Sequence, residues 1–188
     1  HCELVTEAIT RITPHGIVTA DGRERAIDAL VCATGFDTVQ LLSTIRVTGR
    51  DGRTLREAWA QGPEAYYGIT VAGFPNLFMI TGPQSPGVKS QMIFSCQQHV
   101  DWIANCIKDV QGRQMRGIEA TRMAEIAWVQ HNNEVADQTL YPLAKSWYMG
   151  ANIPGKPRVF MPYVGGFGRY RQRCAEIAEA GYQGFVLA

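Results

Sequence analysis

Apolar residues recur at helical spacing in two long stretches of the chain. The first stretch predicts a helix from Ser90, as its cap, to about Val110. Its apolar stripe consists of Met92, Cys96, His99, Ile103 and Ile107. The second predicts a helix over residues 122–138, with a face of Ala124, Trp128, His131 and Val135. We expect His99 and His131 to pack on these faces with one ring nitrogen hydrogen-bonded each, rather than to bind a ligand.

The first 36 residues have the pattern of a small β unit. Extended stretches are expected over residues 3–12 and 16–19, with a hairpin-type turn at Asp21 and Gly22. The apolar run over residues 29–33 shows no alternation, which predicts a strand buried on both faces.

Strands and helices alternate along the remainder of the chain. The segment "NLFMITGP" (76–83) is a second short apolar strand stopped by a glycine. A strand is predicted over residues 158–164 and a helix over 168–180. This alternation favours the α/β class.

Composition narrows the classes of partner. The 188 residues include 18 basic and 17 acidic ones, so the net charge of +1 gives no general attraction to nucleic acid, membranes or acidic substrates. Five cysteines without a C-x-x-C pair indicate reduced thiols in the cytoplasm, and their spacing to the four histidines predicts no metal site. No apolar window is long enough for a membrane helix. Because the sequence opens directly in a strand pattern, we expect it to be the middle of a longer protein.

A glycine-rich segment near the end could bind a nucleotide or nucleic acid, or could have only a structural role. "VGGFGRYR" (164–171) follows a predicted strand and opens a predicted helix, as a phosphate-binding fingerprint does. However, Arg171 stands where the third glycine belongs, which disfavours a nucleotide loop. Basic residues interleaved with aromatic ones could bind nucleic acid, but the neutral total charge favours a solvated helix face. These basic residues are Lys156, Arg158, Arg169, Arg171 and Arg173.

Two longer stretches carry a resemblance to a known family. The segment "GPQSPGVKSQM" (82–92) and the segment "SWYMGANIPGKPRVFMPYVGGFGRYRQRCAEIAEAGYQGFVL" (146–187) are similar to the C-terminal portion of type I Baeyer–Villiger monooxygenases. The similarity is closest to the phenylacetone and steroid monooxygenase branch and covers essentially the whole chain. In this family both glycine-rich fingerprints, for FAD and for NADPH, lie upstream of such a segment.

The resemblance implies an α/β, partial two-dinucleotide-binding-domain flavoprotein fold. Residues 1–36 would be the C-terminal end of an NADPH-binding domain. Residues 37–188 would be the C-terminal part of an FAD-binding domain, including a mobile loop over 146–157. Enzymes of this family use FAD, NADPH and O2 to convert ketones into esters or lactones.

The resemblance also assigns roles to individual residues. Thr34 and Gly35 of "ATGFD" (33–37) would lie where the chain returns from the NADPH domain to the FAD domain. Gly82 and Pro83 would start a loop at the flavin edge, and the backbone of Met92 would contact the flavin. Trp147 would fold over bound NADP. The substrate pocket would be lined by Gly87, Val88 and Lys89.

Two positions depart from the family pattern. Lys89 stands where close relatives tend to have an apolar residue, so either its amine points to solvent or the pocket accepts a more polar substrate. Gln84 replaces a usual glycine and is expected to add bulk near the flavin. The family signature F-x-G-x-x-x-H-x-x-x-[WF] and the catalytic arginine would lie upstream, so no residue of this chain is assigned a catalytic role.

Three functions are therefore compared. The first is a C-terminal fragment of a Baeyer–Villiger monooxygenase, inactive alone and holding FAD weakly. The second is a fragment of an N- or S-oxygenating flavin monooxygenase, which we expect to lack the long "ANIPGK…VGGF" tail. The third is a non-catalytic module that associates with itself, since helix faces that would pack on an absent half should be exposed and favour a homodimer.

Overall fold

The chain forms two compact units, His1–Phe36 (unit 1) and Asp37–Ala188 (unit 2). The computed structural model describes residues 2–34, 42, 44–144, 146–150, 155 and 158–188. The assignment of these units to an NADPH domain and an FAD domain stays a prediction.

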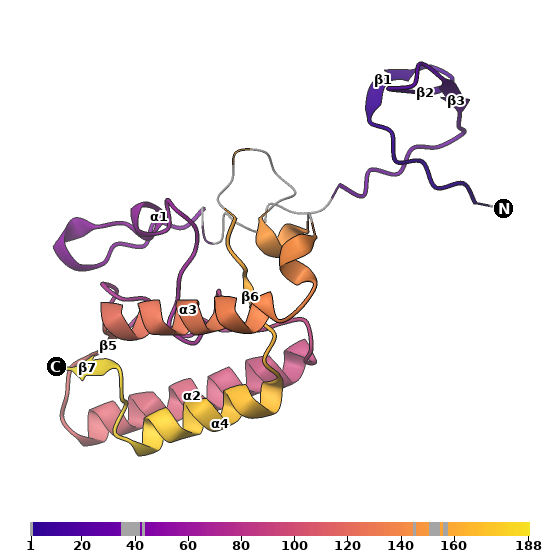
Figure 1. Ribbon diagram of the computed structural model, residues 1–188. Coiled ribbons are helices and arrows are strands. Elements are labelled where there is room, and N and C mark those ends of the chain that lie inside the picture. Colours follow the sequence, from indigo (N-terminus) through magenta and orange to yellow (C-terminus); the bar gives the residue numbers. More distant parts are fainter. Residues whose placement is uncertain (1, 35–41, 43, 145, 151–154, 156–157) are drawn as a thin grey trace. The chain divides into compact units, whose positions relative to one another are not determined.

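Unit 1 is a three-stranded antiparallel sheet in the order β1-β2-β3 (Figure 1). The strands are β1 (Ile9–Thr13), β2 (Gly16–Thr19) and β3 (Glu24–Ala26). The carboxylate of Asp21 closes the β2–β3 turn, because it accepts hydrogen bonds from the Thr19 hydroxyl at 2.6 Å and the Arg23 backbone N–H at 3.1 Å. Gly22 supplies the left-handed φ of 80° that this turn requires. The predicted turn at Asp21 and Gly22 is confirmed.

The strand predicted over residues 29–33 is wrong. These residues form no ladder, and Val31 is 84% exposed instead of buried. A strand obtains its hydrogen bonds from a neighbouring strand, and the sheet of unit 1 ends at β3. The first predicted stretch, over 3–12, is also shorter in the structure, where β1 begins at Ile9.

Three long helices dominate unit 2: α2 (Met92–Gly112), α3 (Arg122–Asp137) and α4 (Phe167–Glu179). Each begins and ends within two residues of its prediction. Thr121 caps α3 by accepting a hydrogen bond from the Ala124 N–H at 3.2 Å. The predicted cap of α2 is wrong, since Gln91 holds the cap position without a side-chain bond and Ser90 instead lies 3.2 Å from the Ser95 hydroxyl. Shorter helices are α1 (Leu55–Ala58) and the 3-10 turns Arg50–Gly52, Tyr141–Leu143 and Trp147–Met149.

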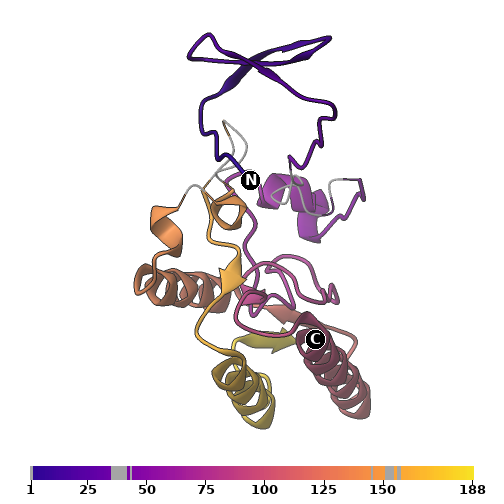
Figure 2. The same ribbon diagram turned by 90° about the vertical axis from the view of Figure 1, so that its right-hand side faces the viewer.

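The strands of unit 2 are short and pair across long sequence distances. β4 (Ser85–Pro86) runs parallel to β6 (Pro162–Tyr163), and β5 (Ile118–Ala120) runs antiparallel to β7 (Phe185–Leu187). α4 packs against α2, and α3 packs against β6; Figure 2 views the three helices nearly end-on. Helices and strands are thus mixed, as the α/β class requires.

The strand predicted over residues 76–83 is replaced by an irregular segment. Asn76 and Thr81 have left-handed φ angles of 59° and 53°, and such residues interrupt a regular ladder. The segment is held by single bonds, such as Met79 N–H to the Ile69 carbonyl at 2.7 Å. The strand predicted over 158–164 is likewise reduced to β6.

Aromatic side chains form the main core of unit 2. The rings of Tyr67 and Trp128 stack with centroids 3.8 Å apart, and Tyr163 and Tyr170 pack around them. These residues come from a loop, α3, β6 and α4, so the core links these four parts of unit 2.

Candidate functional site

An apolar pocket of about 370 Å3 lies at the start of α2. This volume is at the lower end of the range for small-molecule sites. Its walls come from the 81–88 segment, the first residue of α2, the Trp147–Met149 turn and β6. The lining residues are Thr81, Gly82, Pro83, Ser85, Pro86, Gly87, Val88, Met92, Trp147, Tyr148, Met161 and Pro162.

One wall of the pocket is a strained turn over residues 81–84. Thr81 and Gln84 both have left-handed φ angles, 53° and 59°, although neither is glycine. Such conformations cost of order 1–2 kcal/mol each and persist where the surroundings determine them. The contacts that hold this turn therefore define the shape of the pocket.

Two glycines bring the turn close to a neighbouring loop. The Gly82 N–H donates to the Gly68 carbonyl at 3.0 Å. A Cβ on Gly68 would lie 2.5 Å from the Ser85 Cβ, and one on Gly82 would lie 2.6 Å from the Gly68 carbonyl oxygen. Neither position has room for a side chain. Close packing therefore requires glycine at position 82, beside the pocket.

Gln84 points away from the pocket. Its side chain is fully buried, accepts from the Ala65 N–H at 2.9 Å and donates to the Pro63 carbonyl at 3.0 Å. The Gln84 carbonyl also accepts from the Trp128 indole N–H at 3.1 Å. The expectation that this residue adds bulk near the flavin is therefore wrong, because all its polar atoms are used to fasten the turn to the core.

His99 fastens the other end of the same turn. Its Nδ1 accepts from the Thr81 N–H at 2.9 Å, and its Nε2 lies 2.6 Å from the Tyr170 hydroxyl. Burial lowers the pKa of His99 from 6.5 to about 4, against a smaller opposing effect of the Met79 backbone, so the ring is neutral at pH 7. Both ring nitrogens are bonded, not one as expected. At His131, the buried Nε2 has no hydrogen-bond partner.

The pocket brings together six of the nine residues to which the resemblance gives a role. These are Gly82, Pro83, Gly87, Val88, Met92 and Trp147. Lys89 is exposed and is not part of the lining, which agrees with an amine that points to solvent. Thr34 is exposed in unit 1, and Gly35 lies outside the described residues.

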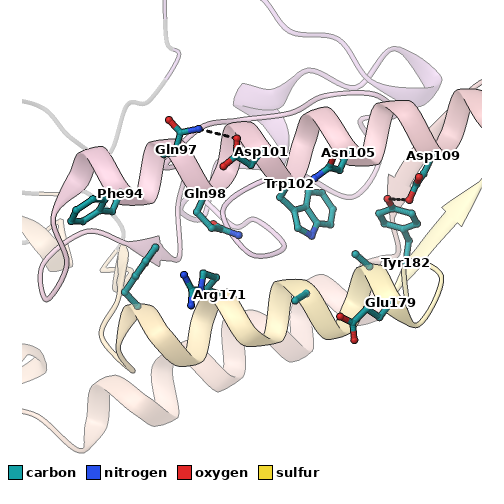
Figure 3. A pocket seen from close by; sticks show the side chains of 13 residues that line it. Phe94, Gln97, Gln98, Asp101, Trp102, Asn105, Asp109, Arg171, Glu179 and Tyr182 are labelled. Atoms are coloured by element: carbon teal, nitrogen blue, oxygen red, sulfur yellow. Dashed lines mark hydrogen bonds between the residues drawn. The ribbon is translucent and has the colours of Figure 1, made fainter.

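A second hollow, of about 530 Å3, lies between α2 and α4 and contains none of the predicted site residues (Figure 3). Figure 3 shows the Trp102 ring between the two helices, with Asp109 bonded to the Tyr182 hydroxyl at 2.8 Å at one end. Acidic side chains (Asp101, Asp109 and Glu179) outnumber the single basic one, Arg171. The residues to which the resemblance gives a role line the apolar pocket, and none of them lines this groove.

The glycines of "VGGFGRYR" have a packing explanation. A Cβ on Gly165 would lie 2.2 Å from the Tyr163 hydroxyl oxygen, so this glycine makes room for a core tyrosine. Gly166 precedes α4 with a φ of 96°, a value that favours glycine. These local causes account for the first two glycines without a nucleotide.

No metal site or membrane helix is seen in the part of the chain that the structure describes. No group of three or more His, Cys, Asp or Glu side chains there could hold a metal ion. None of the helices described is both long and apolar enough to cross a bilayer.

Comparison with known proteins relates the chain to a family of enzymes. No family model matches the chain. An acetone monooxygenase (methyl acetate-forming) from Gordonia sp. (strain TY-5) is 41% identical over 182 residues, which are 96% of this chain and 34% of that protein. The NADP+-bound crystal structure of cyclohexanone monooxygenase from Rhodococcus sp. Phi1 superposes with a TM-score of 0.86 at 37% identity, over 96% of this chain and 34% of that one. The chain belongs to the Baeyer–Villiger monooxygenases.

The steroid monooxygenase branch of this family is also represented. Oxidised steroid monooxygenase bound to NADP is 43% identical, with a TM-score of 0.81 over 95% of this chain and 33% of that one. The chain spans about a third of the length of these relatives and corresponds to their C-terminal part. The family and the flavoprotein fold predicted from the sequence are thereby confirmed.

One criterion from the sequence does not hold. A phenazine N-monooxygenase from Lysobacter antibioticus is 41% identical over 180 residues, 95% of this chain and 33% of that protein. A match of this length leaves few residues unmatched and must include most of the tail that N-oxygenating enzymes were expected to lack. The tail therefore does not separate ketone oxidation from N-oxidation.

Sequence reasoning missed the residues that fasten the pocket wall. His99 was assigned to general packing and Gln84 to the flavin side. Their partners, Thr81, Tyr170, Ala65 and Pro63, lie 18 to 71 positions away along the chain. The polar residues themselves were the available signal. A histidine within an apolar helix stripe is expected to be buried, and buried polar groups are hydrogen-bonded. The same holds for a glutamine in a short segment between two prolines.

Proposed function

We propose that this chain is the part of an FAD- and NADPH-dependent Baeyer–Villiger monooxygenase that forms the wall of the flavin and substrate site. The observation that carries this proposal is the convergence of Gly82, Pro83, Gly87, Val88, Met92 and Trp147 on one apolar pocket. The family resemblance assigns a role to each of these six residues. Five of the six lie within residues 82–92, and the fold brings Trp147 to them from 55 positions further along the chain.

The pocket residues fit a flat, partly polar ring system. The lining is mainly apolar, and Gly82 and Pro83 allow close approach of backbone to a ring. Met92 is the first residue of α2, whose Gln91 cap makes no side-chain bond and whose first turn has no acidic residue. The free N–H groups and the dipole of this helix start favour negative charge on a bound group. Reduced flavin, when bound, supplies the electrons with which O2 is activated.

The remaining residues would position and cover the reactants. Trp147, which is 46% exposed, stands beside Tyr148 with ring centroids 3.9 Å apart and can cover a nicotinamide with its indole face. Gly87 and Val88 would shape the place of the ketone and exclude water from it. We assign no proton transfer or bond-making step to this chain, because the catalytic arginine is expected upstream.

A chimeric enzyme tests this function. The upstream two thirds of the acetone monooxygenase would be joined to this chain and purified. We expect bound FAD, NADPH oxidation that ketones stimulate, and an ester product. A soluble, FAD-loaded chimera that oxidises NADPH without forming ester from any ketone of a broad panel would contradict the proposal.

N-oxidation is the second candidate, and the phenazine N-monooxygenase is the observation that favours it. The same chimera offered phenazine and a ketone in separate assays distinguishes the two reactions. Formation of N-oxide without ester would favour N-oxidation, whereas ester alone would favour the first proposal.

We also propose that the isolated chain associates with itself and resides in the cytoplasm. The five cysteines are free, which is usual for a reducing compartment. Ile93, Val100 and Ile107 of α2 are exposed apolar residues at intervals of seven. A heptad interval keeps residues on nearly the same helix face, so they form an apolar stripe suited to another helix.

A further inference from the structure

The turn over residues 81–84 needs an external constraint at each of its strained ends. At Gln84 this constraint is the residue's own buried side chain. At Thr81 it is the backbone N–H, which donates to Nδ1 of His99 at 2.9 Å across 18 residues of sequence. His99 is fully buried on α2. An apolar side chain could fill the same space without the cost of burying polar nitrogens, so packing alone does not explain a histidine here.

The hydrogen bonds around His99 fix its tautomer. Because a backbone N–H can only donate, Nδ1 of His99 is the acceptor, and the proton of the neutral ring is on Nε2. Nε2–H then donates to the Tyr170 hydroxyl oxygen at 2.6 Å. The Tyr170 O–H donates in turn to the Tyr67 carbonyl at 2.5 Å. The three bonds point in one direction. If Tyr170 donated to Nε2 instead, the ring proton would sit on Nδ1 opposite the Thr81 N–H, and the Tyr67 carbonyl would lose its donor.

We propose that His99, oriented by Tyr170, is a positioning residue that holds Thr81 in its left-handed conformation and so aims Gly82 and Pro83 into the pocket. The identity of the ring that these residues face rests on the proposed function; the positioning itself does not. This role joins α2 and α4 to the pocket wall, because Tyr170 belongs to α4 and is fully buried. Burial also raises the pKa of Tyr170, which keeps its hydroxyl protonated as a donor.

Two substitutions, each of which replaces one ring nitrogen by an amide group, separate positioning from packing. In His99→Asn the amide oxygen can take the place of Nδ1 and accept from Thr81, while the bond to Tyr170 is lost. In His99→Gln the amide group can take the place of Nε2 and donate to Tyr170, while the acceptor for Thr81 is lost. Both variants remove the ring, so loss of packing alone would affect them similarly.

Amide hydrogen exchange of the complete 188-residue chain gives the decisive readout. We expect the Thr81 and Gly82 amides to exchange roughly tenfold faster in His99→Gln and to stay near the original rate in His99→Asn. Amides at the far end of α2, such as that of Cys106, serve as the internal reference for global opening. Equal acceleration of Thr81 and Cys106 in both variants would overturn the proposal.

A measurement on the unsubstituted chain covers the case in which neither variant folds. We expect the 15N shifts of His99 to report an Nε2–H ring and a nitrogen–nitrogen coupling to join the Thr81 amide to Nδ1. An Nδ1–H ring or the absence of the coupling would overturn the proposal.

Titration with lumiflavin, the ring alone, distinguishes this inference from the function on which it draws. We expect the Gly82 and Met92 amide signals to shift in the original chain and in His99→Asn, and to shift at higher ligand concentration in His99→Gln. If lumiflavin shifts neither signal while the exchange pattern holds, the flavin assignment of the pocket fails and the positioning role of His99 stands.

Discussion

At the scale of single residues, Gln84 shows how a side chain can replace secondary structure. It closes two backbone hydrogen bonds, to Ala65 and Pro63, that no strand supplies there. Gln84→Gly would relieve a left-handed φ, worth about 1 kcal/mol, but would leave two buried backbone groups without partners at about 1–3 kcal/mol each. We therefore expect the free energy of unfolding to fall by about 2 kcal/mol. Urea unfolding followed by tryptophan fluorescence measures it, since all four tryptophans lie in unit 2.

Gln114→Gly is the matched control for this substitution. Gln114 has nearly the same φ, 57°, but is exposed. Relief of the left-handed backbone and the greater entropy of unfolded glycine oppose each other here, so stability should change by less than about 0.5 kcal/mol. Equal effects of the two substitutions would show that the buried bonds of Gln84 contribute nothing.

The buried ring of His99 makes stability depend on pH. The unfolded chain binds a proton at this residue below pH 6.5, whereas the folded chain does so only near pH 4, because burial lowers the pKa. The unfolded state therefore binds more protons in this window, and the free energy of unfolding should fall as pH decreases from 6.5 to 4, by up to about 3 kcal/mol. The slope should be shallower in His99→Asn, while His131 contributes equally to both. Parallel profiles of the two proteins between pH 7 and pH 4 would contradict this assignment.

At the scale of elements, the three long helices were predictable from the sequence, whereas among the strands only β2 was predicted with its observed bounds. α2, α3 and α4 follow from apolar spacing because each helix makes its hydrogen bonds internally and needs only one face to be buried. The runs 29–33 and 76–83 have strand-like composition, but a strand also needs a partner and an unbroken extended backbone. The left-handed φ of Asn76 and Thr81 removes the second condition, and no composition rule reveals it.

The exposed stripe of α2 predicts how the isolated chain behaves in solution. Ile93 is 70% exposed, and Val100 and Ile107 lie on the same face. We expect the chain to sediment as a dimer at micromolar concentration and Val100→Lys with Ile107→Lys to shift it toward monomer. Met123→Lys, at an exposed apolar site on α3, is the control and should leave the dimer intact. A monomeric original chain would exclude this interface.

The Trp147–Met149 turn predicts a separate effect on the nicotinamide cofactor. In the chimera, Trp147→Ala should weaken NADP binding by about 1–3 kcal/mol, roughly 5- to 150-fold, because a covering aromatic contact is lost. Leu143→Ala, at an exposed residue just before this turn, should not change the affinity. Fluorescence titration measures both. Unchanged affinity in Trp147→Ala would remove this residue from the site.

At the scale of the whole molecule, the sequence predicted several of the residues that line the pocket but not how they are arranged in space. The resemblance identified its residues because a long terminal stretch is specific to the family. Periodicity identified none of them as neighbours, because β4 and β6, which frame the pocket, are two residues long and pair residues 77 positions apart. The hydrogen bonds by which His99 and Gln84 hold the turn also join residues far apart in the sequence, so local sequence patterns do not predict them.

The last prediction follows from what the pocket of this chain contains. Its pocket offers apolar walls and one helix start, which suit a ring. Most of the polar recognition of a dinucleotide comes from a glycine-rich turn that binds the pyrophosphate and an acidic residue that binds the ribose. Contacts to the ring alone must offset a binding cost of about 4–15 kcal/mol in lost rigid-body freedom, so we expect FAD to bind the isolated chain weakly.

The isolated chain should accordingly show no oxygenase activity. Incubation with excess FAD, NADPH and a panel of aryl and cyclic ketones, followed by gas chromatography, should give no ester above a control without protein. The chimera, assayed in parallel, shows that the panel and the detection are adequate. We proposed that the fingerprint for the hydride donor and the arginine at the reacting oxygen lie upstream, so the isolated chain would lack the largest electrostatic contribution to catalysis. Ester formed by the isolated chain and abolished by Trp147→Ala would show that this segment is catalytically sufficient and that the division of labour proposed for it is wrong.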